Sequence, residues 1–278
     1  MALQVQIWIK SIIENLFADN SFASKSVDHS EFVNEKTVHV PNAGAAPSVV
    51  KNRTTFPATV TTREDVDLSY DIDEFSVDPI RIPNADKVEL SYNKRESIIR
   101  GSRNKLADDI HASLIYSWIP SGVNTIFTEG AAVSAHIASA TGNRKSMTKA
   151  SVEAAQLLFD SQNIPQTGRY MLLDAYMYNQ LKNSMTNNEV VAFLAGADPE
   201  KGVIGEYAGF RFYKRGQVAK TTKAGVLKEW SAAADATDSA AGIAWQEDCV
   251  SRALGASILF DDEGNPLYYG DIISFLQR

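Results

Sequence analysis

The stretch from residue 37 to residue 83 constrains the fold most, because it is patterned for strands yet carries too few apolar residues to fold back on a core. Over residues 65–73 apolar and acidic side chains alternate, which is the period of a strand with one wet, acidic face. Between residues 40 and 60 the chain is rich in Pro, Asn and Gly and has few large apolar side chains. The pattern predicts a long antiparallel hairpin with an extended tip, which projects from the body and is held by a neighbour.

The first segment, residues 1–17, predicts a helix that is apolar on more than one side. Ile12 lies on the main apolar face at 100° per residue, whereas Trp8 and Phe17 point elsewhere. Such a helix lies deep in its own core or packs against another chain, and its terminal position leaves both alternatives open. It lacks the basic start and the small-residue cleavage site of a signal peptide.

The composition is that of a globular protein of one or two domains, with 44% hydrophobic and 22% charged residues in 278. No run approaches the roughly 20 apolar residues of a bilayer-spanning helix, so a soluble protein is expected. A net charge of −7 counts against wrapping nucleic acid and suits a wall that encloses DNA without adhering to it. The single cysteine, Cys249, is expected to be a buried and inert thiol.

A long helix is expected over residues 86–118, with Asp86 as its cap. Two charged residues, Glu96 and Arg103, interrupt its apolar stripe, and Glu96 stands four residues before Arg100 in the favourable order for an ion pair. These charges belong to a half-exposed helix edge or meet a partner across an interface, and the pattern leaves both open.

The remaining elements alternate without a strict βαβ rhythm and without a repeat, which indicates an α+β fold. In order, they are a loop with weak helical pieces over 119–146, a helix from Thr148 that ends before Pro165, a strand over 169–173, helices over 174–184 and 188–195, a strand over 209–213, a small-residue linker over 231–242, a strand over 243–245, a helix near 248–254, and a hairpin that turns at 262–265 before a last strand with Tyr268, Tyr269, Ile272 and Phe275.

Residues for catalysis, cofactor binding or metal binding are not predicted. Four histidines are scattered without metal-ligand spacing, and a structural role is expected for the third of them: His29, His39, His111 and His136. Four carboxylates share one strand face, but an array along an extended strand does not converge on one cation, so a solvated or Arg-facing surface is expected: Asp65, Asp67, Asp71 and Asp73. Phosphate-loop, G-x-S-x-G and dinucleotide motifs are absent from the sequence.

Six segments carry a resemblance to a known family, through their order and spacing. They are residues 32–41 and 66–72, residues 86–118, residues 168–173, the Gly205, Gly209 and Phe210 pattern, and residues 266–271. In this order they resemble the Hong Kong 97-like major capsid proteins of tailed double-stranded DNA bacteriophages.

The resemblance implies an α+β, Hong Kong 97-like capsid fold with five regions. These are an N-terminal arm over 1–36, an extended hairpin (E-loop) and its base over 37–86, a peripheral domain with the spine helix over 87–146, an axial domain over 147–230, and returning strands and a helix over 231–278 that close both domains. Because the arm starts almost at residue 1, a long scaffolding segment ahead of it is not expected.

The resemblance also implies a structural protein of the virion and not an enzyme. Hexamers and pentamers would assemble in the host cytoplasm into an icosahedral shell around double-stranded DNA, without sequence-specific DNA binding and without a membrane. Portal, scaffolding and decoration proteins are the further candidate partners. The candidate inter-subunit contacts are Trp8, Ile12, Phe17, Phe56, Glu96, Arg100 and Arg103.

Two other functions stay open. An encapsulin-like nanocompartment would share the fold and hold cargo enzymes in place of DNA. A cytosolic enzyme with an unrecognised site would instead be a discrete monomer or small oligomer, with a concave pocket of convergent polar groups.

Overall fold

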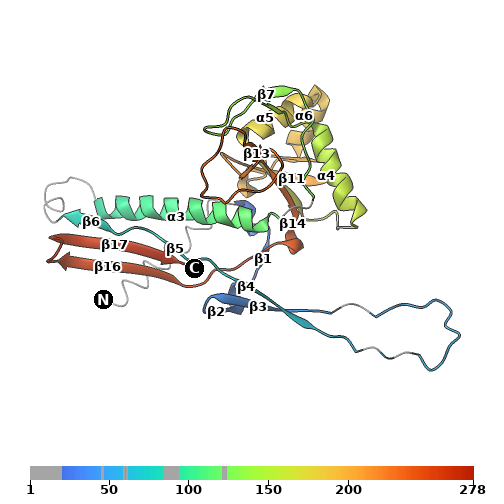
Figure 1. Ribbon diagram of the computed structural model, residues 1–278, viewed down its shortest axis with the longest axis horizontal. Helices are drawn as coiled ribbons and strands as arrows, with labels where there is room; N and C mark the ends of the chain where they lie inside the picture. Colours follow the sequence, from blue (N-terminus) through green and yellow to red (C-terminus); the bar gives the residue numbers. More distant parts are fainter. Residues whose placement is uncertain (1–20, 45–46, 59, 61, 84–93, 121–123) are drawn as a thin grey trace.

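The computed structural model describes residues 21–44, 47–58, 60, 62–83, 94–120 and 124–278, with the side chains of 94–97 and 199 left out. The chain is of the α+β class, as predicted, and has three parts (Figure 1). A compact lobe spans residues 124–250, a long sheet lies under helix α3, and a hairpin projects to one side.

The compact lobe is built on a four-stranded sheet in the order β10, β11, β9, β14, of which β9 and β11 run parallel. The strands are β9 (Arg169–Asp174), β10 (Gly205–Tyr207), β11 (Phe210–Arg215) and β14 (Ile243–Gln246). All six residues of β9 are buried, as is usual for a central strand. Alternate residues therefore serve different cores: Met171 and Leu173 face one cluster, and Tyr170 and Leu172 face the other.

Three helices cover one face of this sheet: α4 (Lys149–Ser161), α5 (Ala175–Ser184) and α6 (Asn187–Ala195). Asp174 starts α5, because its carboxylate accepts the Met177 N–H at 2.6 Å. Thr186 and Glu189 form a capping box that starts α6. The sheet meets α6 closely at Gly205, where a Cβ would lie 2.4 Å from the Phe193 ring.

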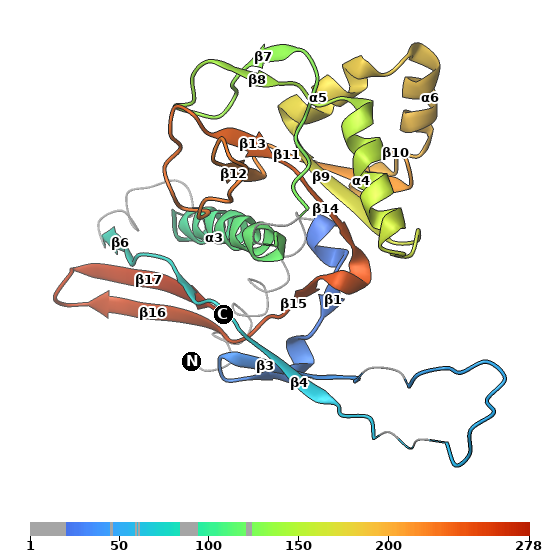
Figure 2. The ribbon, with the colours of Figure 1, turned by 45° about the vertical axis from the view of Figure 1, so that its right-hand side comes forward.

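Helix α3 (Lys94–Trp118) packs on the long sheet, which is formed by β16 (Ser257–Asn265), β17 (Gly270–Gln277), β5 (Phe75–Ser76) and β6 (Ile80–Pro83). Ile99 and Leu106 of α3 share a core with Ile273 and Phe275 of β17. Near the end of α3, Ile115 instead enters the core under the compact lobe. One helix thus joins the two bodies (Figure 2).

The projecting hairpin consists of β3 (Thr37–Asn42), an extended loop seen at residues 43–44, 47–58, 60 and 62–65, and β4 (Val66–Asp71). Strand β2 (Val33–Asn34) completes a three-stranded sheet at its base. The loop reaches well away from the rest of the chain (Figure 1). The smaller strands are β1 (Val27–Asp28), β7 (Ala132–Ser134), β8 (Asn143–Lys145), β12 (Ala219–Thr221), β13 (Ser239–Ala241) and β15 (Ser251–Arg252).

Residues 21–28, which form an anchor segment within the predicted N-terminal arm, pack into the body. Phe22 is buried against Trp118 and Trp245, and β1 pairs in parallel with β15. The guanidinium of Arg252 donates to Ala23 O, to Ser26 Oγ at 3.1 Å and to Asp28 Oδ2 at 3.1 Å. The chain is therefore fixed to the body from Ser21 onward.

The predicted long helix, the helix after Thr148, the strand at 169–173 and the two short helices are confirmed. The predicted helix over 1–17 and the Asp86 cap lie outside the described residues. The predicted loop over 119–146 contains the strand pair β7 and β8.

Four predictions near the C-terminus are wrong. In place of a helix near 248–254 the chain forms a short 3-10 turn (Glu247–Cys249) and β15, because β15 pairs with the anchor segment. The last hairpin turns at 266–269 and not at 262–265, because β16 continues through an irregularity between Asp262 and Asn265. Tyr268 and Tyr269 lie in that turn, and Cys249 is exposed, since the short turn that carries it lies at the surface.

We predict that Leu181→Ala lowers the free energy of unfolding by about 3 kcal/mol, because this fully buried side chain leaves a cavity among tightly packed neighbours. The matched control is Leu157→Ala in α4, whose exposed side chain should contribute less than about 0.5 kcal/mol. Urea denaturation of the subunit measures both, and equal losses would contradict the assignment of this core.

Candidate assembly surfaces

The stem of the projecting hairpin is closed by side chains that pair across its two strands. Backbone pairing runs from Thr37 opposite Asp71 to Asn42 opposite Val66. The Thr37 hydroxyl donates to Asp71 Oδ1 at 2.8 Å, and His39 Nδ1 lies 2.7 Å from Asp67 Oδ2. The strand carboxylates therefore find partners on the facing strand.

The mouth of the loop is fixed by Asp65. Its Oδ1 accepts the Gly44 backbone N–H at 2.9 Å and the Arg63 Nε–H at 2.6 Å. The hydrogen bond from Gly44, assisted by that from Arg63, lowers the pKa of the Asp65 carboxyl. Of the two predicted alternatives, the solvated acidic face is the one observed, and in the part of the chain that the structure describes only Asp65 meets an arginine. Within the described residues, no three His, Cys, Asp or Glu side chains come together in a way that could hold a metal ion.

Beyond that mouth, the loop carries apolar side chains that nothing in the described chain covers. Phe56 is 75% exposed, Val49 96% and Val60 93%. Val66 and Leu68 on β4 are exposed as well, so the face opposite the acidic one is also open to solvent in the single subunit. Grouped apolar exposure of this kind marks an interaction surface. Phe56, a predicted contact, lies within it.

The predicted contacts on α3 are only partly described. Arg100 is exposed, whereas Arg103 is half-buried and its Nε is enclosed without a hydrogen bond to the described residues. The side chain of Glu96 lies outside the described part, as do Trp8, Ile12 and Phe17. Whether these residues meet a neighbouring subunit therefore stays a prediction.

A second apolar surface was missed in the sequence. The turn between β16 and β17 presents Leu267, which is 82% exposed, with Tyr268 and Tyr269 beside it. On β16, Ile258 and Phe260 also point to solvent. The apolar run at 267–269 suggested a strand, and only the long-range pairing of β17 with β6 and β16 shows where the turn falls.

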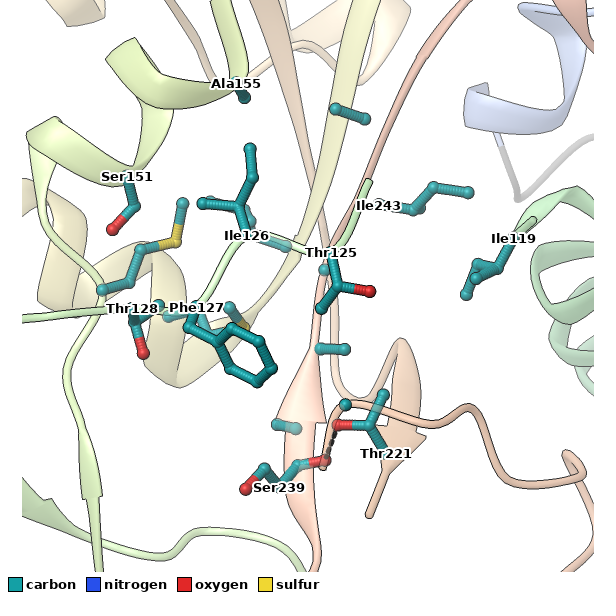
Figure 3. A pocket seen from close by; sticks show the side chains of 18 of the residues that line it. Ile119, Thr125, Ile126, Phe127, Thr128, Ser151, Ala155, Thr221, Ser239 and Ile243 are labelled. Atoms are coloured by element: carbon teal, nitrogen blue, oxygen red, sulfur yellow. Dashed lines mark hydrogen bonds between the residues drawn. The ribbon is translucent and has the colours of Figure 1, made fainter. Parts of the chain in front are cut away.

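A cavity of about 930 Å³ lies in the compact lobe, beside the segment 124–129. Figure 3 shows Ile119, Ile126, Phe127 and Ile243 in its largely apolar lining.

Two charged groups of the lining, those of Arg144 and Asp238, serve structural contacts. Arg144 donates to backbone carbonyls of Asp238 and Ala236, and Asp238 accepts a hydrogen bond from Lys228. These two charges are therefore taken up by contacts within the compact lobe.

A His and Asp pair lies close to this cavity. His136 Nε2 is 2.7 Å from Asp174 Oδ2, but the other oxygen of Asp174 caps α5. The His136 ring stacks on Tyr176 at 4.7 Å between ring centroids. Both groups are therefore engaged in holding the segment around residue 136 against the end of β9 and the start of α5.

Solved structures share this arrangement over most of the chain. A chain in the capsid structure of cyanophage P-SCSP1u is 17% identical with a TM-score of 0.59, over 91% of this chain and 81% of that chain. The capsid of Ralstonia phage GP4 gives 11% identity and a TM-score of 0.58 over 91% and 80%, and the capsid of a native GTA particle gives 12% and 0.56 over 93% and 84%.

This chain has the fold of a phage capsid protein. The match spans about nine tenths of its length, so the phage capsid fold takes in more than the compact lobe alone. By sequence, no protein-family model and no curated relative matches the chain. Among the described helices, none combines the length and the apolar character needed to cross a membrane.

We predict that trypsin first cuts the free subunit after Lys51 or Arg53, because both lie in an exposed loop without regular structure. Arg169 is the internal control, since its buried side chain lies in the central strand and should resist cleavage until the lobe unfolds. Timed digestion with mass spectrometry gives the order of cuts. A first cut inside the compact lobe would contradict the assignment of the loop as the accessible part.

Proposed function

We propose that this protein is the major capsid protein of a tailed double-stranded DNA bacteriophage. The observation that carries the proposal is the match of about nine tenths of the chain to phage capsid structures. That these relatives are phage or GTA capsids also supports a DNA-enclosing shell over an encapsulin-like compartment. The role is structural and not enzymatic.

We propose the Hong Kong 97-like version of this fold. The projecting hairpin corresponds to the E-loop, α3 to the spine helix of the peripheral domain, and residues 147–230 within the compact lobe to the axial domain. The regional boundaries are those inferred from the sequence: 1–36, 37–86, 87–146, 147–230 and 231–278.

In the proposed shell, the projecting hairpin lies on a neighbouring subunit. Burial of its apolar side chains stabilises the contact by about 25 cal/mol for each Å² of apolar surface that a neighbour removes from water. Its tip also carries Lys51 and Arg53 without a carboxylate between residues 47 and 60, so an acidic partner surface suits it. The contacts proposed for the interfaces remain Trp8, Ile12, Phe17, Phe56, Glu96, Arg100 and Arg103.

Repetition of such contacts would build hexamers and pentamers into an icosahedral shell of the virion. The net charge of −7 suits a wall that contains DNA without strong phosphate contacts. Portal, scaffolding and decoration proteins are the proposed further partners.

Negative-stain microscopy of the purified protein, or of the particle that it comes from, tests the proposal. We expect closed shells tens of nanometres across. A protein that stays monomeric at high concentration under a broad set of assembly conditions would overturn it.

We predict that replacing residues 43–65 by Asn-Gly keeps the fold and abolishes closed shells. Asn42 and Val66 are paired neighbours across the hairpin, so a two-residue turn joins β3 to β4 directly. Far-UV circular dichroism should match that of the unaltered chain, which separates failed assembly from failed folding. Normal shells from this variant would contradict the role of the hairpin.

Deletion of residues 1–20 should likewise abolish shells and leave a soluble subunit. The anchor segment that follows is fixed by contacts of its own, so the body keeps its core after the deletion. Microscopy and size-exclusion chromatography provide the readout, and unchanged particles would remove this segment from the assembly account.

A further inference from the structure

His111 lies where α3, the anchor segment, β11 and β15 meet, and its ring is fully buried. Its Nδ1 lies 2.6 Å from Ala107 O. A carbonyl oxygen only accepts, so the neutral ring carries its proton on Nδ1. Acid would therefore add the second proton at Nε2, which is also shielded from solvent.

The anchor segment covers this ring. The Phe22 ring packs edge-on against His111, with 5.9 Å between centroids and an interplanar angle of 70°. Phe22 is itself buried, in contact with Trp118 and Trp245. Protonation of His111 would thus place a positive charge among the apolar side chains that surround Phe22.

Among the described residues, more of the formal charges that act on His111 oppose a second proton than favour it. Arg215 of β11 and Arg252 of β15 act against protonation, while Asp108 of α3 itself acts for it. Asp28 of β1 is ion-paired with Arg252 at 3.1 Å. Burial lowers the pKa of His111, and the two arginines act in the same direction, against the Ala107 hydrogen bond and Asp108.

A few polar contacts with the body hold the anchor segment at this junction. Arg252 holds it through Ala23, Ser26 and Asp28, and the Trp245 indole N–H donates to Lys25 O at 2.8 Å. Its strand β1 has two residues, whereas α3 has 25 and contributes to two cores. Because its Phe22 ring lies directly on the imidazole, opening of the junction at His111 displaces this segment.

We propose that His111 is an acid-sensitive latch: its protonation releases the anchor segment, residues 21–28, from the body. A released segment would let the arm that precedes it reach a different site on a neighbouring subunit, and this consequence rests on the proposed function. The release itself is a property of one subunit.

The direction follows from linkage. In the open state the imidazole is in water, where its pKa is near 6.5, so the open state binds the proton more tightly than the closed one. The closed state is favoured above that pH. Below it, the stability of the closed state relative to the open state falls as the pH falls. If the closed state stays unprotonated, the opening constant rises about 25-fold between pH 7 and pH 5.

Hydrogen exchange of the full-length protein at pH 7 and pH 5, corrected for the intrinsic exchange rate, tests the latch. Peptides within 21–28 should exchange roughly 25-fold faster at pH 5 in the unaltered chain. His111→Gln keeps an amide donor for Ala107 O and cannot be protonated, so it should show no such rise. His39→Gln, at an exposed histidine of the projecting hairpin, is the matched control and should behave like the unaltered chain.

Equal exchange of residues 21–28 at both pH values in the unaltered chain, or an undiminished rise in His111→Gln, would overturn the latch. If His111→Gln does not fold, exchange at the imidazole C2 position of the unaltered chain reports the protonation of each histidine by mass spectrometry. An ordinary titration of His111 in the closed subunit would then refute the proposal. Microscopy of the same sample at pH 7 shows separately whether shells form, so failure of the latch and failure of the capsid function are distinguishable.

Discussion

The packing of α3 against two separate cores is the interaction on which the rest of the structure depends. Ile99 and Leu106 hold the helix on the long sheet, and Ile115 holds its far end under the compact lobe. Burial of each such side chain contributes about 1.5–3 kcal/mol, so the two bodies are joined through a hydrophobic contact and not only through loops. The proposed capsid lattice would need this rigidity, because a small error in the angle between the bodies would be repeated at every copy.

The same arrangement leaves some large apolar side chains of the subunit exposed to solvent. The loop of the projecting hairpin and the turn at 266–269 both place large apolar side chains in water. A stable interface removes about 800 Å² of surface from each partner, which is more than a single exposed side chain supplies. Several separate apolar surfaces on one subunit therefore fit contacts with several neighbours, as a closed shell requires.

Much of this could be predicted from residue patterns that act locally. Alternation at 65–73 identified β4, and the shortage of apolar residues near Pro41 and Pro57 predicted that the loop would project. Phe56 could be named as a contact because a large apolar residue in a coreless segment has no cover in its own subunit.

The errors lie where distant segments decide the structure. β15 exists because it pairs with the anchor segment more than 200 residues earlier, and a local pattern at 248–254 predicted a helix instead. The start of β17 at Gly270, which places the turn at 266–269, likewise coincides with its pairing with Pro83 of β6, far earlier in the chain. His111 was expected to be structural, and only the fold brings Phe22 and Arg252 to it.

The central claim is that this chain completes its apolar burial on sister subunits. Hydrogen exchange of residues 47–58, compared between assembled particles and dissociated subunits at one pH, tests it most directly. The account predicts strong protection of this loop in particles and fast exchange in free subunits. Equally fast exchange in both states would contradict it, because the loop would then remain in water after assembly.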